Sequence, residues 1–167
     1  IQPDWAIHLA AISSVEHHEQ EAFYKVNVFG TLNLLEALAK LKKLPQKVLI
    51  ASSANVYGMP DVDRIDERIC PKPVNHYACS KLAMEHLTHN YFAQLPIIIT
   101  RPFNYTGIGQ KTNFLIPKLV EHFALRRPTL QLGALEISRD FCDVSDVVSS
   151  YQALLQSDHH SEIVNIC

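Results

Sequence analysis

Tyr77 and Lys81 stand four residues apart in the segment NHYACSK at residues 75–81. On a helix this spacing places both side chains on one face, with their Cβ atoms about 5–6 Å apart. A free tyrosine titrates near pH 10, and a neighbouring ammonium favours the phenolate, so the sequence predicts a lowered pKa for Tyr77. Such a pair can act as a general acid or base, although the same spacing also occurs in helices that have no catalytic function.

Ser53 lies in the segment ASSANVYG, directly after an apolar run that is typical of a buried strand. In open α/β sheets, ligands bind at the carboxyl ends of the strands. The Ser53 hydroxyl could therefore donate a hydrogen bond to a carbonyl oxygen of a substrate. The alternative is a turn serine that bonds only the backbone.

These residues must be positioned by strands and helices that alternate along the first two thirds of the chain. Short apolar runs predict strands, and apolar residues at helical spacing predict helices of a dozen residues or more. The alternation predicts an α/β fold of the Rossmann type, with a doubly wound parallel sheet. The strands are expected in DWAIHLAAIS, KVLIASS and PIIITRPF, the helices near residues 22–41 and 77–93, and a loop over residues 59–74.

The pattern becomes less regular after Asn104. The sequence predicts a helix with a proline kink in NFLIPKLVEHFALRR and another helix in VSDVVSSYQALLQ. Short strands are expected in TLQLG and EIVNIC. We therefore predict a partial nucleotide-binding domain at residues 1–104 and, at residues 105–167, part of a smaller lobe whose strands return to the main sheet.

The composition of the 167 residues is that of a globular protein, with 47% apolar and 19% charged residues. A net charge of −2 provides no basic surface for nucleic acid. The longest apolar runs are too short to span a membrane, and no signal peptide is visible. The four cysteines are scattered and the histidine-rich segments match no metal motif, so we expect free thiols, no metal site and a cytoplasmic location.

Ser53, Tyr77 and Lys81, with HLAAISSV before them and RPFN after them, resemble the extended short-chain dehydrogenase/reductase family. The similar branch contains nucleotide-sugar epimerases, dehydratases and reductases. The resemblance implies NAD or NADP as cofactor and a nucleotide-diphosphate sugar as substrate. It also implies a homodimer formed through the helices at residues 22–41 and 77–93. The Gly-rich first strand–turn–helix of the family is not found, so we expect an inner portion of that fold, without its N-terminal βαβ unit.

The resemblance also implies functions for individual residues. Ser53 and Tyr77 would hold the sugar C4 oxygen, Tyr77 would transfer the proton, and Lys81 would bind the nicotinamide ribose. The cofactor-binding residues would be Leu9, Ala10, Ala11, Ser13, Asn27, Ser52, Tyr77, Lys81, Pro102 and Phe103, and the substrate-binding residues Ser14, Asn55, Asn104, Asn113, Lys118 and Arg139.

Three residues have structural alternatives. Asn27 can be a structural helix residue, and Arg139 can pair with a neighbouring aspartate in RDFCDVSDVV. His8 is expected to be a packing residue.

The reaction type is narrowed by the residues after Ser53. Dehydratases of this family have acidic residues there, whereas this chain has Ala54 and Asn55, which cannot ionise. The segments RPFNYTGIGQ and NFLIPKLV resemble the reductases that act on GDP-4-keto-6-deoxyhexoses. We therefore expect NAD(P)H-dependent reduction of a C4 ketone. A nucleotide-sugar 4-epimerase and a non-catalytic cofactor-binding protein remain the alternatives.

Overall fold

The computed structural model describes residues 1–13, 19–133 and 135–167. The strands are β1 (Trp5–His8), β2 (Lys47–Ala51), β3 (Ile97–Pro102), β4 (Asn104–Thr106), β5 (Phe141–Asp143) and β6 (Glu162–Ile166). The α-helices are α1 (Gln20–Phe23), α2 (Gly30–Ala39), α3 (His76–Thr88), α4 (Leu115–Ala124) and α5 (Val144–Gln156). Three further turns of helix are η1 (Tyr24–Phe29, π-helical), η2 (Ala54–Tyr57, 3₁₀) and η3 (His89–Tyr91, 3₁₀).

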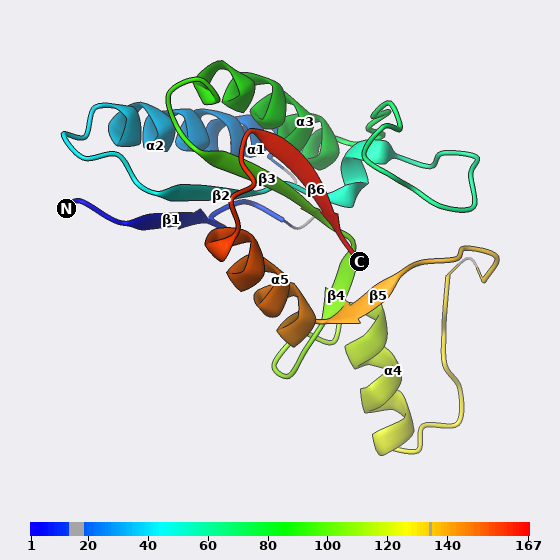
Figure 1. Cartoon of the computed structure of the whole chain (residues 1–167). Helices are drawn as coiled ribbons and strands as arrows, with labels where there is room; N and C mark the ends of the chain where they lie inside the picture. The colour runs from blue at the N-terminus through cyan, green and yellow to red at the C-terminus, as the bar shows by residue number, and fades with distance from the viewer. Residues whose placement is uncertain (14–18, 134) are drawn as a thin grey trace.

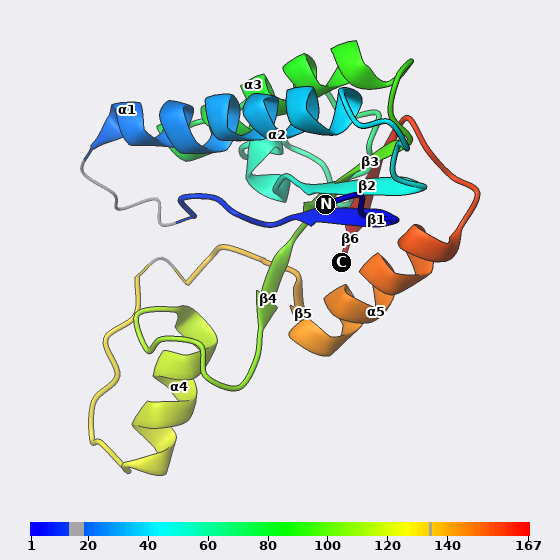
Figure 2. The same cartoon turned by 90° about the vertical axis from the view of Figure 1, so that its left-hand side faces the viewer.

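The centre of the fold is a four-stranded sheet in the order β1-β2-β3-β6, in which all neighbouring strands are parallel. Helices α1, α2 and α3 cover one face of this sheet, and α5 covers the other (Figures 1 and 2). This is the Rossmann-type α/β arrangement that the alternating pattern predicts. The strands and long helices predicted before Asn104 are therefore confirmed.

The alternation of side chains along β2 explains why both faces of the sheet are covered. Val48 and Ile50 belong to the apolar cluster beneath α2 and α3, whereas Leu49 between them packs on the side of α5. Successive side chains of a strand point to opposite faces, so an uninterrupted apolar run requires helices on both sides. Strand β3 follows the same rule, because all six of its residues are buried.

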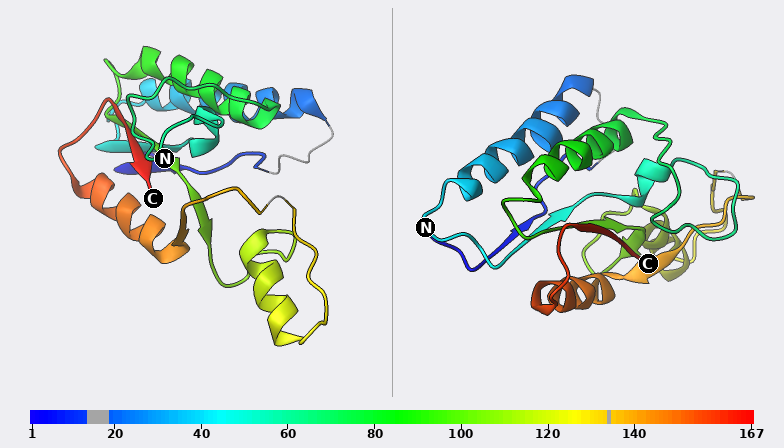
Figure 3. Two further views of the ribbon diagram at one scale, coloured as in Figure 1. Left: turned by 90° about the vertical axis from the view of Figure 1, so that its right-hand side faces the viewer. Right: turned by 45° about the horizontal axis from the view of Figure 1, so that its top comes forward.

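Strands β4 and β5 form a separate two-stranded parallel pair, and α4 lies beyond them, away from the main sheet (Figure 3). The chain then returns through α5 to β6, which pairs with β3. The predicted helix with a proline kink begins at Leu115, so Pro117 lies in its first turn. A proline is tolerated there because the first amide groups of a helix have no intrahelical acceptor. Pro117 therefore gives no reason for the kink that the sequence predicts.

The strand predicted in TLQLG, at residues 129–133, is wrong, since this segment has no strand partner and is largely exposed. The short strand of this region is instead β5, whose three residues pair with β4. Three-residue strands are defined by their partner more than by their own sequence. None of the helices in the described residues is long and apolar enough to cross a membrane.

Candidate active site

The carboxyl ends of β1, β2 and β3 lie at one edge of the sheet, because the three strands are parallel and adjacent. The segment that carries Ser53 begins where β2 ends, and α3 carries Tyr77 and Lys81 across the same region. The structure therefore brings together the three residues that the sequence selects, from two elements separated by the loop at residues 59–74.

Ser53 is buried and occupies the N-cap position of η2. Its Oγ accepts hydrogen bonds from the backbone N–H of Asn55 at 3.2 Å and from the Asn55 side-chain amide at 3.1 Å. A hydroxyl that accepts two bonds still has its own proton to donate. The cap thus fixes the position of Ser53 without using its hydroxyl proton.

Helix α3 is placed by a side-chain cap at its first turn. The Asn75 side chain accepts a hydrogen bond from the Ala78 N–H at 2.8 Å, which satisfies one of the free amides of the helix start. The Tyr77 side chain follows directly, is 8% exposed, and has its ring centroid 6.3 Å from that of Phe23. The cap and this aromatic contact together fix where the phenol lies.

The pKa of Tyr77 is raised above its ordinary value, mainly because burial disfavours the phenolate. A side-chain hydrogen bond with Ser53 opposes this shift, and the nearby phenol of Tyr105 adds to it. The Ser53 hydroxyl is therefore one of the groups that act on the Tyr77 phenol. The lowered pKa expected for Tyr77 is therefore wrong, because the helical spacing from Lys81 does not reveal how deeply the phenol is buried.

Lys81 is 5% exposed, and its amine donates a hydrogen bond to the Ala51 carbonyl at 2.7 Å. Burial lowers the pKa of this amine to about 8, while the carboxylate of Glu85 acts in the opposite direction. The bond to Ala51 joins the middle of α3 to the last residue of β2. Lys81 therefore links the helix that carries Tyr77 to the strand that leads into Ser53.

Asn27 lies inside the π-helical segment η1 and is fully buried. Its side chain accepts from the Ile12 N–H at 2.9 Å and donates to the Ile12 carbonyl at 3.2 Å and to Ser80 Oγ at 3.0 Å. Such π-helical turns often occur at functional sites, where they re-aim a side chain. Here the turn directs Asn27 to the segment that follows β1, so this residue holds that segment against α3.

His8, at the end of β1, is half-buried and bonds Thr31 Oγ1 through its Nε2 at 2.9 Å. Thr31 donates its own proton to the Asn27 carbonyl, so the proton of the His8 bond must come from Nε2. Burial, followed by the charge of Lys81, lowers the pKa of His8. These contacts agree with the packing function predicted for His8.

The remaining cofactor candidates follow β1 and β3. Leu9, Ala10 and Ser13 are exposed and Ala11 is half-buried, so the backbone after β1 is accessible. Ser14 lies outside the described residues.

Pro102 is buried at the end of β3. Phe103 donates its N–H to the Ile166 carbonyl at 2.8 Å, and its ring centroid lies 6.5 Å from that of Tyr57. Pro102 and Phe103 therefore lie at the carboxyl end of β3, next to the end of β6.

Four further substrate candidates are exposed, and three of them bond backbone carbonyls of residues 131–140. These bonds join Asn104 to Asp140 at 3.0 Å, Lys118 to Gln131 at 2.6 Å and Arg139 to Ser138 at 3.3 Å, while Asn113 is an exposed residue just before α4. Among the described residues Arg139 forms no ion pair, so the alternative of an aspartate partner is not what the structure shows. The binding functions of these four residues stay predictions.

Three buried polar residues behind Lys81 were missed by sequence reasoning: Glu85, Arg101 and Tyr57. Their side chains form a network that also includes Ser52, whose hydroxyl donates to Glu85. The side chain of Ser52 therefore faces the protein interior, and its backbone N–H donates to the Thr100 carbonyl at 2.7 Å, so the cofactor-binding function expected for Ser52 stays a prediction. Glu85 lies one helical turn after Lys81, and this spacing was the available signal.

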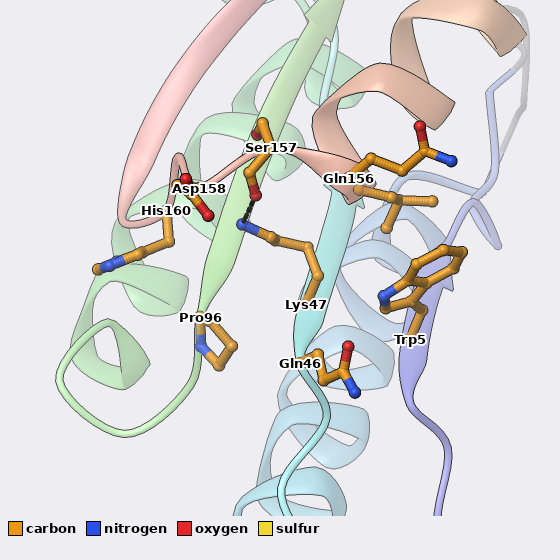
Figure 4. Close-up of a pocket in the computed structure, with 9 residues that line it drawn as sticks. Trp5, Gln46, Lys47, Pro96, Gln156, Ser157, Asp158 and His160 are labelled. Carbon is orange, nitrogen blue, oxygen red and sulfur yellow. Dashed lines mark hydrogen bonds between the residues drawn. The ribbon is translucent and has the colours of Figure 1, made fainter.

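A cavity of about 510 Å³ lies at the opposite edge of the sheet, where β1 and β2 begin (Figure 4). Trp5 forms one of its walls, and the buried amine of Lys47 donates to the carbonyls of Ser157, at 2.9 Å, and His159. These carbonyls follow the end of α5, where backbone acceptors lack intrahelical partners. Lys47 therefore has a structural contact, and this cavity is separate from the site around Tyr77.

Comparison with known proteins supports the assignment made from the residues. The family model described as GDP-mannose 4,6 dehydratase matches residues 1–166. A GDP-6-deoxy-D-talose 4-dehydrogenase from Aggregatibacter actinomycetemcomitans is 40% identical over 99% of this chain and 56% of its own length. A GDP-6-deoxy-D-mannose reductase from Pseudomonas aeruginosa is 36% identical over 99% of this chain and 58% of its own length. The chain thus spans little more than half the length of these relatives.

Among solved structures, that of RMD from Pseudomonas aeruginosa complexed with NADPH superposes with a TM-score of 0.89. It is 35% identical, and the match covers 98% of this chain and 60% of that one. Further relatives are named as nucleotide-sugar 4-epimerases and 4,6-dehydratases. The parallel sheet, the placement of Ser53, Tyr77 and Lys81 at its carboxyl edge, and these matches lead to one conclusion: the chain belongs to the epimerase/dehydratase family of extended short-chain dehydrogenases/reductases.

Proposed function

We propose that this chain carries the catalytic residues of an NAD(P)H-dependent reductase acting on the C4 ketone of a GDP-linked 4-keto-6-deoxyhexose. The observation that carries the proposal is the buried phenol of Tyr77, on which the Ser53 hydroxyl acts, with Lys81 one turn further along α3 and bonded to the end of β2. Two curated relatives, named for redox chemistry on GDP-6-deoxyhexoses, support the choice of substrate.

The residues present fit a nicotinamide dinucleotide, and solved relatives contain NADPH or NAD. An ammonium has three donors, and Lys81 uses one of them on the Ala51 carbonyl, so two remain for ribose hydroxyls. The accessible backbone after β1, with Ala10 and Ala11, allows close approach of a ligand. When bound, the reduced cofactor supplies a hydride.

The protein residues hold the substrate oxygen and supply a proton. The Ser53 hydroxyl, whose proton is not used by Asn55, donates to the C4 carbonyl oxygen when the substrate is bound, and Tyr77, whose pKa is raised, holds its proton at neutrality. On reduction, the new C–H bond at C4 would be made from the electron pair of the hydride. The π electrons of the carbonyl would move to its oxygen, which would form an O–H bond with the proton of Tyr77 and leave a phenolate. The charge of Lys81 stabilises the phenolate that remains.

A 4-epimerase that retains NAD is the second candidate, because relatives include such enzymes and the same three residues would act in both directions. A dehydratase is disfavoured, since Ala54 and the Asn55 amide that bonds Ser53 cannot ionise. A non-catalytic binding protein would not require Tyr77 and Lys81 together, and fold alone does not decide between these activities.

The test uses the protein produced from its complete gene, incubated with GDP-4-keto-6-deoxymannose and either NADH or NADPH. We expect loss of the absorbance of the reduced cofactor, together with a GDP-6-deoxyhexose product whose C4 configuration is assigned by NMR. The variant Tyr77→Phe should lower kcat by about 10²–10⁴-fold, since it removes the proton donor. Tyr91→Phe, at a half-buried tyrosine of η3, is the matched control and should keep full activity.

No oxidation of either cofactor would exclude the reductase, and tightly bound NAD with a C4-epimerised product would establish the epimerase. Full activity of Tyr77→Phe would show that the phenol is not the proton donor. The division at residue 104, the homodimer and the cytoplasmic location stay predictions.

A further inference from the structure

A buried ion pair lies directly behind Lys81. Glu85 follows Lys81 by one turn on the same face of α3, and Arg101 belongs to β3. Their side chains are 1% and 3% exposed, and Arg101 donates to both carboxylate oxygens, through Nε at 3.0 Å and a terminal nitrogen at 2.6 Å. Apolar residues of similar volume are often as stabilising as a buried ion pair, so stability alone does not explain its presence.

The ion pair holds both ends of the segment that contains Ser53. At one end, the Ser52 hydroxyl donates to the carboxylate of Glu85. At the other end, Arg101 donates to the Tyr57 hydroxyl at 2.8 Å and lies over the Tyr57 ring at 4.7 Å from its centroid. Residues 52 and 57 are therefore fixed to one rigid group, and Ser53 lies between them.

The hydrogen-bond network continues from the Tyr57 hydroxyl to β6. This hydroxyl donates to the Asn165 side-chain oxygen at 2.8 Å. The Asn165 backbone N–H in turn donates to the Glu67 carboxylate at 2.6 Å. Every buried polar side-chain atom of the described residues has a partner, so the network is fully satisfied. A satisfied buried network fixes one arrangement of its members.

The same ion pair places a charge beside Lys81. The charged and titratable groups that act on its amine are Glu85 on α3 and His8 on β1, and Arg101 of β3 pairs with Glu85, while Tyr77 lies one turn before Lys81 on α3. His8 is a neutral imidazole near neutral pH, because burial and the charge of Lys81 lower its pKa. Glu85 is therefore the anion that acts on the amine.

We propose that the Glu85–Arg101 ion pair is a positioning element of the reaction: it sets Ser53 relative to Tyr77 and places a fixed negative charge one helical turn from the Lys81 amine. The inference rests on the proposed function for its consequence in catalysis. The inference also predicts that the charge of Glu85 raises the proton affinity of Lys81. This effect can be measured without a substrate.

The first experiment follows the titration of Lys81 by NMR in the complete protein carrying ¹³C-labelled lysine, with the signal assigned from its loss in Lys81→Met. In Glu85→Gln, which keeps the shape of the side chain and removes its charge, we expect the proton affinity of Lys81 to fall about tenfold. Glu36→Gln removes an exposed carboxylate of α2, paired with Lys40 at 3.7 Å, and should leave the titration unchanged.

The second experiment measures kcat and KM against pH with the substrate of the proposed reaction. Glu85→Gln should move the alkaline limb of the plot of kcat against pH about one pH unit lower, which corresponds to the same tenfold fall in the proton affinity of Lys81. Tyr57→Phe keeps the ring beneath Arg101 but removes the hydroxyl, so kcat should fall several-fold with little change in KM. These pH and kcat-against-KM readouts do not change in a variant that only loses stability.

An unchanged Lys81 titration in Glu85→Gln overturns the inference, whatever the activity. If wild-type protein shows no turnover, the proposed function fails, and the titration still decides the inference. If Glu85→Gln does not fold, the double variant Glu85→Gln/Arg101→Met leaves no unpaired buried charge. The proton affinity of Lys81 should again fall, but by less than tenfold, because the Arg101 cation is removed as well. A normal Lys81 titration in the double variant overturns the inference equally.

Discussion

Replacing Lys81 by methionine should stabilise the fold near neutral pH while abolishing the proposed activity. The amine is 5% exposed, and burial lowers its pKa from 10.5 to about 8. Each pKa unit corresponds to ~1.4 kcal/mol, so keeping this amine charged costs the folded state about 3 kcal/mol. Methionine has a similar length and no charge to desolvate.

The cost depends on pH in a definite direction. Below pH 8 the amine is protonated in both states, so the folded protein bears the full cost. Between pH 8 and pH 10.5 the unfolded chain holds a proton that the folded chain has released, so stability rises with pH. The variant also loses the hydrogen bond to the Ala51 carbonyl, a loss of about 1 kcal/mol. The net gain of Lys81→Met at neutrality should therefore be about 2 kcal/mol.

The measurement is urea denaturation of wild type and Lys81→Met at a series of pH values from neutrality to pH 10.5. Other lysines, tyrosines and cysteines titrate in this range, but they are common to both proteins, so the difference in unfolding free energy isolates residue 81. Lys47→Met is the matched control, because Lys47 is also 5% exposed but donates to two carbonyls after α5. The free energy of unfolding of Lys47→Met should be about 1–3 kcal/mol lower than that of the wild type.

The reasoning is refuted if the difference between wild type and Lys81→Met is independent of pH. It would then follow that Lys81 keeps its ordinary proton affinity in the folded state and that its burial is compensated by other contacts. A variant that is less stable than wild type at neutrality, and that gains stability relative to wild type as the pH rises, would contradict the expected sign of the effect.

Three further substitutions test the local geometry around the site. Gly58→Ala should destabilise by more than about 2 kcal/mol in thermal denaturation, because the residue has φ +70° and an added Cβ would lie 2.1 Å from the Lys72 carbonyl oxygen. Gly30→Ala, where the nearest atom is 3.9 Å away, should instead gain about 0.5–1 kcal/mol. Asn27→Ala should lose about 2–4 kcal/mol and speed amide exchange at Ile12, since both backbone groups of Ile12 lose their partner. Normal exchange at Ile12 would show that another group anchors this segment.

The strands and helices could be predicted where an apolar run or a helical spacing of apolar residues dominates the sequence. The run KVLIA predicts a buried strand because Val48, Leu49 and Ile50 must all be covered, and the structure buries them against helices on both faces. The helical spacing of Tyr77 and Lys81 likewise holds in α3. These features depend on local sequence and on the parallel topology that follows from it.

The electrostatics of the site could not be predicted in the same way. Spacing alone predicts a lowered pKa for Tyr77, whereas burial raises it, because desolvation depends on residues distant in sequence such as Phe23. The partner of Glu85 is Arg101, which lies sixteen residues further along on a different element. A buried charge requires a partner, but sequence does not identify which one.

Burial favours the proposed reaction at one of the two catalytic groups and disfavours it at the other. It keeps the proton on Tyr77, which a proton donor needs, and it removes charge from Lys81, which must be cationic to stabilise a phenolate. An anion placed near both groups would favour protonation of both and weaken Tyr77 as an acid. Glu85 is one turn from Lys81 but two turns, about 12 Å along the helix, from Tyr77. Of these two groups, only the lysine has a pKa on which the charge of Glu85 acts. The position of Glu85 thus restores the charge of the amine without further raising the proton affinity of the phenol.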